Sequence, residues 1–186
     1  MPNRIQCFLP NFLVIGAQKC GTTSLCEALS NHPDVFMSDP REPMFFAWDH
    51  LYEKGWGEYT KLFDRVDGES AVGEGSTTYT MHARHPQAAE RVAQNLPHAR
   101  LIYIVRNPMR RMESEYMHRK FTGRTDKSFE EEVPHLIDTA LYWRQLSAYR
   151  QNYPDSQIRV VLFEDFVRDP SSILKELLDF LGVDSH

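Results

Sequence analysis

The 186-residue sequence has no hydrophobic run long enough to cross a membrane. The apolar stretch Phe8–Ile15 is interrupted by Pro10 and Asn11, and a bilayer span needs roughly 20 apolar residues. The first residues also lack the layout of a signal peptide, because Arg4 precedes no adequate apolar region. We therefore expect no integral membrane segment, and these features favour a cytoplasmic protein.

Cysteine is scarce, and the histidines do not cluster with it. Cys7, Cys20 and Cys26 are odd in number and have neither metal-ligand nor redox spacing, which fits a reducing compartment. His82 and His85 have no partner group of Cys, His or Asp nearby in the sequence. We therefore expect no metal site.

An excess of positive charge is also missing, since the formal net charge is −5. Binding to nucleic acid or to anionic membranes is therefore not expected. The charge is uneven, however: residues 100–127 hold eight Lys or Arg and three Asp or Glu. This stretch favours an anionic ligand, although such charges also commonly lie on a solvated helix face.

Short apolar runs alternate with helical patterns, which predicts an α/β fold with a central parallel sheet flanked by helices in three layers. We expect one domain over residues 1–186. The expected strands are 12–15, 35–37, 71–74, 101–105 and 158–163. The expected helices are 22–29, 56–63, 86–95, 108–120, 128–139, 141–151 and 170–181.

The loop after the first strand has the glycine spacing of a phosphate-binding loop, Gly16-x-x-x-x-Gly21. Unpaired N–H groups and the positive end of the next helix would meet there, at a site for an anion. Thr22 stands where a nucleotide-hydrolysing P-loop carries its Lys, and Lys19 lies inside the loop instead. A sulfuryl group carries fewer charges than a transferring phosphoryl group, so this P-loop-like arrangement suits a 5′-phosphosulfate without metal.

The expected anion-binding residues of this loop are contiguous: Lys19, Cys20, Gly21, Thr22, Thr23 and Ser24. Cys20 allows a second interpretation, because a helix N-terminus can lower the pKa of a thiol and make it a nucleophile. A third is that Cys20 fills a small, close-packed space. An ordinary glycine-containing turn between strand and helix also remains open.

A second constellation follows the strand 101–105. Arg106 leaves the end of this strand, and Ser114 lies two turns into the following helix, so both can face the crevice at the strand ends. The pattern Arg106-x-Pro-x-x-Arg-x-x-Ser114-x-Tyr, together with Lys19-x-Gly-Thr-Thr-x-Leu, resembles sulfotransferases that use 3′-phosphoadenosine 5′-phosphosulfate (PAPS). The similarity is to glycan and heparan-type enzymes and to bacterial ones. It implies that Arg106 and Ser114 bind the 3′-phosphate and that Lys19 is catalytic.

Glu42 is the candidate general base. It lies in Arg41-Glu-Pro-Met-Phe-Phe46, among prolines and aromatics where desolvation favours a carboxyl group that accepts a proton near neutrality. The segment resembles the Lys/Arg-Glu-x-x-Phe-Phe segment of glycan sulfotransferases, whose Glu deprotonates the acceptor hydroxyl. The alternative is a surface carboxylate paired with Arg41 while the two phenylalanines enter the core.

The segment Val72–Tyr79 resembles the Glu-Lys-x-Pro-x-Tyr segment that lines the substrate cleft of the family, and it departs from it twice. Gly75 stands in place of the Lys, and Thr77 in place of the Pro. Glu74 is expected at the cleft. The missing cation leaves lipid-linked or small hydroxyl acceptors open beside a carbohydrate. His118, four residues beyond Ser114, is expected either near the acceptor or in solvent.

The resemblance runs from about Phe12 to Gly182 and implies a PAPS-dependent sulfotransferase with PAPS as co-substrate, a small-molecule or glycan acceptor and no metal. It also implies a further C-terminal segment, which we expect this chain to lack. Two other functions stay open: a P-loop-like nucleotide kinase or phosphotransferase, and a non-catalytic module that binds PAPS or its product PAP. The sequence predicts no oligomeric state.

Overall fold

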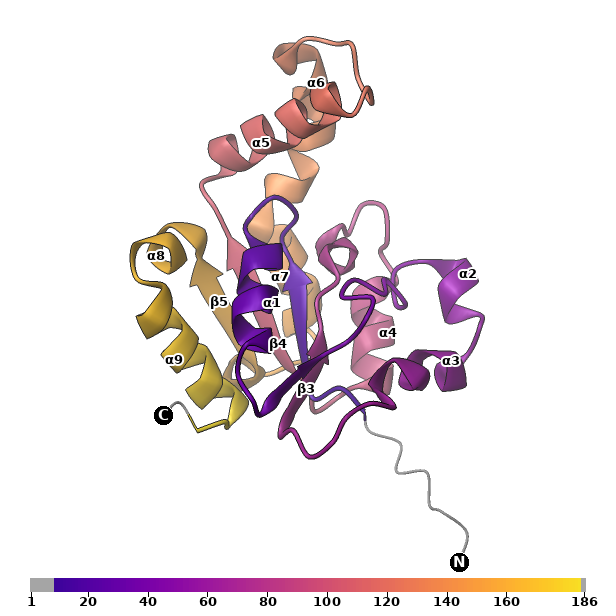
Figure 1. Cartoon of the computed structure of the whole chain (residues 1–186). Helices are drawn as coiled ribbons and strands as arrows, with labels where there is room; N and C mark the ends of the chain where they lie inside the picture. The colour runs from indigo at the N-terminus through magenta and orange to yellow at the C-terminus, as the bar shows by residue number, and fades with distance from the viewer. Residues whose placement is uncertain (1–8, 185–186) are drawn as a thin grey trace, which may run out of the picture.

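The computed structural model describes residues 9–184 and contains a parallel five-stranded sheet, in the order β2-β3-β1-β4-β5 (Figure 1). The strands are β1 (Phe12–Gly16), β2 (Val35–Met37), β3 (Ala71–Glu74), β4 (Arg100–Val105) and β5 (Ile158–Leu162). Apolar residues fill β1 and β4 almost completely because both faces of a parallel sheet are covered. The predicted α/β fold with a central parallel sheet is confirmed.

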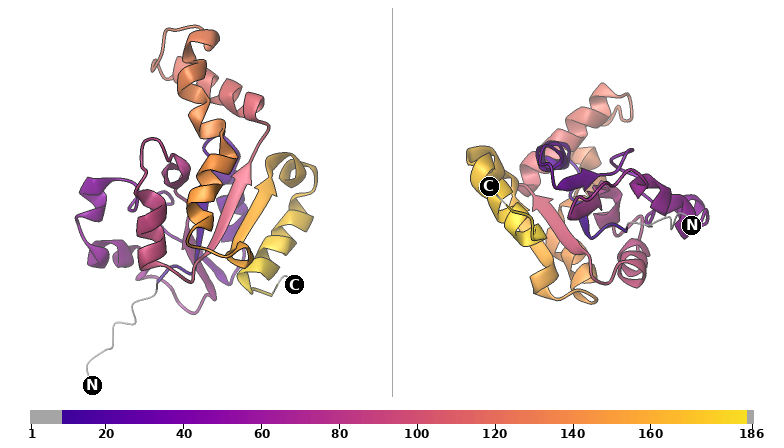
Figure 2. Two further views of the ribbon diagram at one scale, coloured as in Figure 1. Left: turned by 180° about the vertical axis from the view of Figure 1, so that it is seen from behind. Right: turned by 60° about the horizontal axis from the view of Figure 1, so that its bottom comes forward.

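Helices cover the sheet on both sides. α1 (Thr22–Ser30) and α9 (Pro170–Leu181) lie on one face, and α4 (Ala88–Asn95) and α7 (Tyr142–Arg150) on the other (Figures 1 and 2). The three-layer prediction is therefore also correct. Among the helices of residues 9–184, none combines the length and the apolar character needed to cross a membrane.

Two helices extend beyond the carboxyl ends of the strands, and Figure 1 shows them as a projecting arm. They are α5 (Pro108–Phe121) and α6 (Phe129–Leu136). Arg111 joins them: its fully buried guanidinium donates to Glu115 at 2.6 Å and to the Leu136 carbonyl at 2.7 Å. Because an unpaired buried charge is costly, this network holds α5 and α6 together.

The small helices α2 (Asp49–Tyr52) and α3 (Trp56–Thr60) lie beside α4 (Figure 1). An ion pair of 2.6 Å between Arg91 and Asp49 holds α2 to α4. Phe45 and Phe46 are buried and touch aromatic rings of this region, including Tyr59. The segment around Glu42 is thus anchored in the core by its two aromatics.

The structure differs from the sequence expectations at several elements, among them α2, which was not expected, and the helix 56–63, which is divided into α3 and a 3₁₀ turn at Lys61–Phe63. The last strand ends at Leu162, and Phe163 begins a helix that was not predicted, α8 (Phe163–Arg168). Glu164 and Asp165 occupy the first turn of that helix, where negative charge is favourable. The expected helix 128–139 is divided into α6, with Pro134 inside it, and a 3₁₀ turn at Asp138–Ala140. A second 3₁₀ turn, η2 (Thr77–Thr80), was also missed.

The closeness of β1 and β3 gives a stability prediction. Gly73 pairs with Phe12, and a Cβ at position 73 would lie 2.6 Å from the Phe12 ring. We expect Gly73→Ala to lower the free energy of unfolding by about 1–3 kcal/mol, as in other overpacked cores. Urea unfolding measures this change. The matched control is Gly57→Ala in α3, where a Cβ meets nothing within 4 Å and helix propensity gives a gain of up to about 1 kcal/mol. Equal effects of the two substitutions would contradict the prediction.

Candidate active site

The loop between β1 and α1 has a backbone that only particular residues permit. Gly21 adopts a φ of 87°, and a Cβ there would lie 2.7 Å from the ring of Phe163. Lys19 also has a positive φ, of 66°, which is uncommon outside glycine. α1 then begins at Thr22, so its unpaired N–H groups lie next to this loop. The loop and the helix end form a cradle for an anion.

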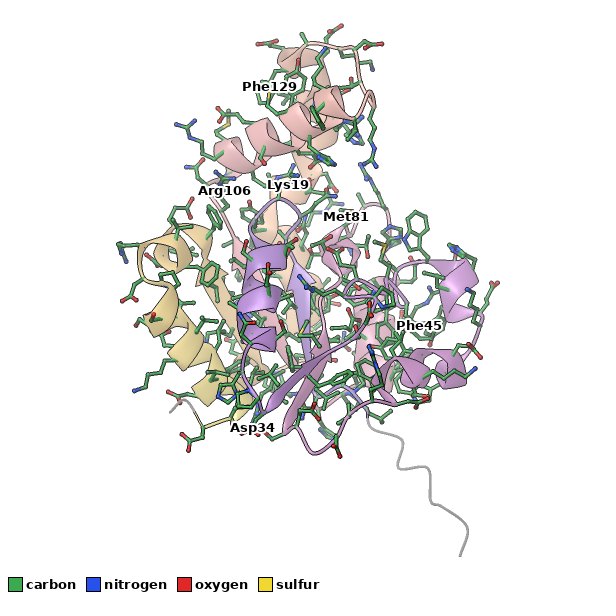
Figure 3. The ribbon with its side chains drawn as sticks, viewed as in Figure 1. Lys19, Asp34, Phe45, Met81, Arg106 and Phe129 are labelled. Carbon is green, nitrogen blue, oxygen red and sulfur yellow. The ribbon has the colours of Figure 1, made fainter. Side chains whose placement is uncertain are left out.

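This loop borders a cavity of about 510 Å³ at the carboxyl ends of the strands. Figure 3 shows Lys19 and Arg106 above the sheet, below the arm formed by α5 and α6. The cavity gathers residues from α1, α5, α8, η2 and three loops: Gln18, Lys19, Gly21, Thr22, Thr23, Ser24, Glu42, Met44, Thr77, Thr78, Arg106, Ser114, His118 and Phe163. The structure thus brings together every predicted site residue except Cys20 and Glu74.

Two cations of the cavity lack acidic partners. Within residues 9–184, neither Lys19 nor Arg106 has a carboxylate at salt-bridge distance. The Arg106 guanidinium lies 4.7 Å from the centroid of the Phe163 ring. Ser114 and His118 face the same cavity from α5. A pair of uncompensated cations with hydroxyls around them can bind an anionic ligand at two places.

Cys20 does not belong to this lining. Its side chain is fully buried, its N–H donates to the Ala17 carbonyl, and its thiol lies 3.5 Å from the Tyr142 hydroxyl. Burial raises the pKa of the Cys20 thiol above its usual range, despite the hydroxyl and the nearby arginines. Such a thiol stays protonated, so the geometry contradicts both the anion-binding and the nucleophile interpretations of Cys20. The turn at Lys19 directs the Cys20 side chain into the core. The sequence did not indicate this, because Cys20 lies between two residues of the loop motif.

Hydrogen bonds hold the Glu42 loop to the chain after β3. The Gly75 N–H donates to the Arg41 carbonyl at 3.0 Å, and the Met44 N–H donates to Ser76 Oγ at 2.9 Å. The Thr77 hydroxyl donates directly to Glu42 Oε2 at 3.0 Å. The Glu42 carboxylate is therefore fixed at the edge of the cavity by partners that the sequence alone did not identify.

Glu74 lies beneath the cavity, not in its lining. Its carboxylate is fully buried and accepts hydrogen bonds from Tyr59 at 3.2 Å, Tyr79 at 2.5 Å and Ser76 at 2.8 Å. Burial raises the pKa of Glu74 to about 7, although the three hydroxyl donors lower it. Ser76 links this carboxylate to the Met44 N–H, so Glu74 supports the Glu42 loop from below.

Two polar atoms of the lining are buried without a partner in the described part of the chain. They are Gln18 Oε1 and Thr78 Oγ1. Buried polar atoms are normally hydrogen-bonded, and both residues line the cavity that holds Lys19. The Thr78 hydroxyl, the cradle around Gly21 and the cations Lys19 and Arg106 fit an anionic substrate with several oxygens, whereas Gln18 Oε1 can only accept a hydrogen bond. Between residues 9 and 184, no three His, Cys, Asp or Glu side chains gather as metal ligands would.

The geometry agrees with the comparisons to known proteins. A sequence model described as the sulfotransferase family matches residues 71–186. A sulfotransferase from Alicyclobacillus acidocaldarius is 32% identical, with a TM-score of 0.85 over 96% of this chain and 83% of that one. The chain belongs to the sulfotransferase family.

Other relatives of this sulfotransferase chain are more distant or much longer. Human heparan sulfate glucosamine 3-O-sulfotransferase 3B1 is 31% identical over 94% of this chain and 46% of its own length. The chain thus spans about half the length of this curated relative. Mouse sulfotransferase SULT7A1 complexed with PAP has a TM-score of 0.64 at 16% identity, over 94% of this chain and 59% of that one, and shares the fold.

The buried Glu74 gives a pH prediction. Its pKa is higher in the folded state, about 7, than the usual 4.5, so the folded protein binds the extra proton between these values. Binding of this proton stabilises the fold fully below pH 4.5. The free energy of unfolding then falls by about 3 kcal/mol as the pH rises from 4.5 to about 7. Unfolding in urea across this range should show a steeper decline in the wild type than in Glu74→Gln. Parallel curves for the two proteins would contradict it.

The Ser76 link gives a second prediction. Ser76→Ala removes the acceptor of the Met44 N–H, so hydrogen exchange at this amide should accelerate about fivefold to tenfold. NMR of the backbone amides measures it. Ser147→Ala, which deletes a hydroxyl that donates to the Trp143 carbonyl, is the control and should leave Met44 unchanged. An unchanged exchange rate in Ser76→Ala would show that the hydroxyl does not hold the loop.

Proposed function

We propose that this protein transfers a sulfuryl group from PAPS to a hydroxyl group of an acceptor, with a carbohydrate as the preferred class. One observation carries the proposal: Lys19, Glu42, Arg106 and Ser114 line a single cavity. Membership of the sulfotransferase family supports it, as does the similarity to the human heparan sulfate sulfotransferase.

The two cationic ends of the cavity suit the two ends of PAPS. The Lys19 loop and the N-terminus of α1 would bind the 5′-phosphosulfate, because N–H groups and helix dipole both favour an anion there. Arg106 and Ser114 would bind the 3′-phosphate. An ordinary nucleoside triphosphate has no 3′-phosphate, and Thr22 stands where a kinase loop needs Lys. The kinase alternative therefore has less support.

The proposed reaction is a direct in-line transfer. The acceptor oxygen forms a bond to sulfur while the bond between sulfur and the bridging phosphate oxygen breaks and PAP leaves. Glu42 takes the proton of the acceptor hydroxyl, and Thr77 keeps the carboxylate in place. Lys19 stabilises the negative charge that develops on the bridging oxygen.

Titration calorimetry with PAP tests the donor site. We expect wild-type protein to bind PAP, and Arg106→Ala to weaken binding by at least about tenfold because a charged hydrogen bond to phosphate is lost. Arg110→Ala is the matched control, since Arg110 is exposed, pairs with Glu113 and does not line the cavity.

Two outcomes of binding titrations and one outcome of a transfer assay separate the alternatives. Absence of PAP binding, or binding unaffected by Arg106→Ala, contradicts the PAPS assignment. Binding of ATP with Mg²⁺ in preference to PAP would favour the nucleotide kinase. Binding of PAP without transfer of ³⁵S from labelled PAPS to any screened acceptor would favour the non-catalytic module.

The role of Glu42 is tested separately. Glu42→Gln should lower kcat by about 10²- to 10⁴-fold and leave the Kd for PAP unchanged, because only the proton acceptor is lost. Turnover is followed as ³⁵S transfer to an acceptor identified by screening. Glu58→Gln, at an exposed carboxylate paired with Lys61, is the control. If kcat of Glu42→Gln equals that of the wild type, the base is another group.

A further inference from the structure

A second cavity adjoins the first on the side away from Arg106. It measures about 570 Å³ and shares three lining residues with the first cavity, Thr22, Thr23 and Glu42. One side of α1, the end of β2 and the start of the Glu42 loop form its other walls, with Gly75 after β3. This volume lies within the range of small-ligand sites, and the shared Glu42 gives an occupant access to the proposed base.

The charges of the second cavity do not suit an anion. Its lining carries the two carboxylates Asp39 and Glu42 and a single cation, Arg41. Asp39 also lies 3.6 Å from the exposed Arg65. A ligand with several sulfate or carboxylate groups would bring like charges next to Asp39 and Glu42, where Arg41 is the one cation in the lining, and this opposes binding.

Two of the hydroxyl groups of this cavity are better acceptors than donors. Ser30 donates its hydroxyl proton to the Glu27 carbonyl at 2.8 Å, and Ser38 donates to the Pro40 carbonyl at 2.8 Å. Both oxygens keep lone pairs for a ligand, and the two carboxylates are acceptors as well. Such a lining matches a ligand that brings hydrogen-bond donors, as neutral sugar hydroxyls do, whereas sulfate oxygens need donors.

Gly75 keeps position 75 free of any side chain. A Cβ built on Gly75 would lie 2.6 Å from Cys26 Sγ, while its next neighbour, Val14 Cβ, is at an ordinary 3.5 Å. The backbone at Gly75 has no positive φ, so the Cys26 sulfur is the obstacle to a larger residue. Gly75 and Cys26 together therefore determine that this wall supplies no cation.

We propose that the second cavity binds the acceptor and that the acceptor is a neutral, polyhydroxylated carbohydrate, not a polyanionic glycan. The inference rests on the proposed sulfuryl transfer, because it takes Glu42 as the group that both cavities share. Gly75 and the excess of acceptor atoms are the features that select the neutral class, and Cys26 keeps a larger residue out of position 75.

NMR titration of the PAP-saturated protein tests the proposal without an activity assay. The probes are chitotetraose, a neutral tetrasaccharide, and a fully sulfated heparin tetrasaccharide. We expect chitotetraose to shift the backbone amides of Ser38 and Gly75 with an affinity at least about tenfold higher than that of the heparin probe. Equal or tighter binding of the heparin probe overturns the proposal, as does the absence of binding by chitotetraose at these amides.

A variant that adds a positive charge at position 75 tests the role of Gly75 and Cys26. In Cys26→Ala the obstructing sulfur is gone, so Gly75→Lys combined with Cys26→Ala adds a cation to the wall. This double variant should narrow or reverse the preference between the two probes. Cys26→Ala alone and Gly57→Lys, which adds the same charge in open space on α3, should keep the wild-type preference. An unchanged preference in the double variant would contradict the proposed selection.

PAP titration separates failure of this inference from failure of the proposed function. If PAP binds and Arg106→Ala weakens PAP binding, but chitotetraose does not bind, the proposed acceptor class is wrong and the proposed donor site is supported. If PAP does not bind at all, the sulfuryl transfer itself is contradicted, whichever sugar the second cavity accepts.

Discussion

The site depends on one constraint: all five strands run parallel, so their carboxyl ends meet along the same edge of the sheet. The loop after β1 supplies Lys19, the residue after β4 is Arg106, and the chain after β3 holds the Glu42 loop through Ser76 and Thr77. Residues that are far apart in sequence therefore reach one cavity. Ser114 on α5 adds the last side, and the buried Arg111 network joins α5 to α6.

The parts of the fold that sequence predicted are those with local signals. Short β-branched or aromatic runs such as 101–105 indicate buried strands, and Pro108 indicates the start of α5, so these elements lie within one residue of their expected bounds. α8 was missed because Leu162–Phe166 is apolar enough to resemble a strand, and the acidic residues that favour a helix there lie in its middle. The local sequence therefore does not decide between strand and helix here. In the structure the segment is helical and Phe166 is buried in the core.

The candidate site divides in the same way. Lys19, Arg106 and Ser114 stand at recognisable spacings, and the cavity contains all three. Gln18, Ser76 and Thr78 carry no pattern, because their positions arise only when η2 meets the loop after β1 and the Glu42 loop. Cys20 shows the opposite error. It lies inside the motif, yet the left-handed turn at Lys19 sends its side chain into the core.

Two-ended recognition of one nucleotide is the central claim, and ³¹P NMR of bound PAP tests it most directly, because the 5′- and 3′-phosphates give separate resonances. The account predicts that both resonances shift on binding to the wild type. In Lys19→Ala the 5′ resonance should return toward its free position, and in Arg106→Ala the 3′ resonance should do so. Loss of the 5′ shift in Arg106→Ala with the 3′ shift retained, or no shift in the wild type, would contradict the account.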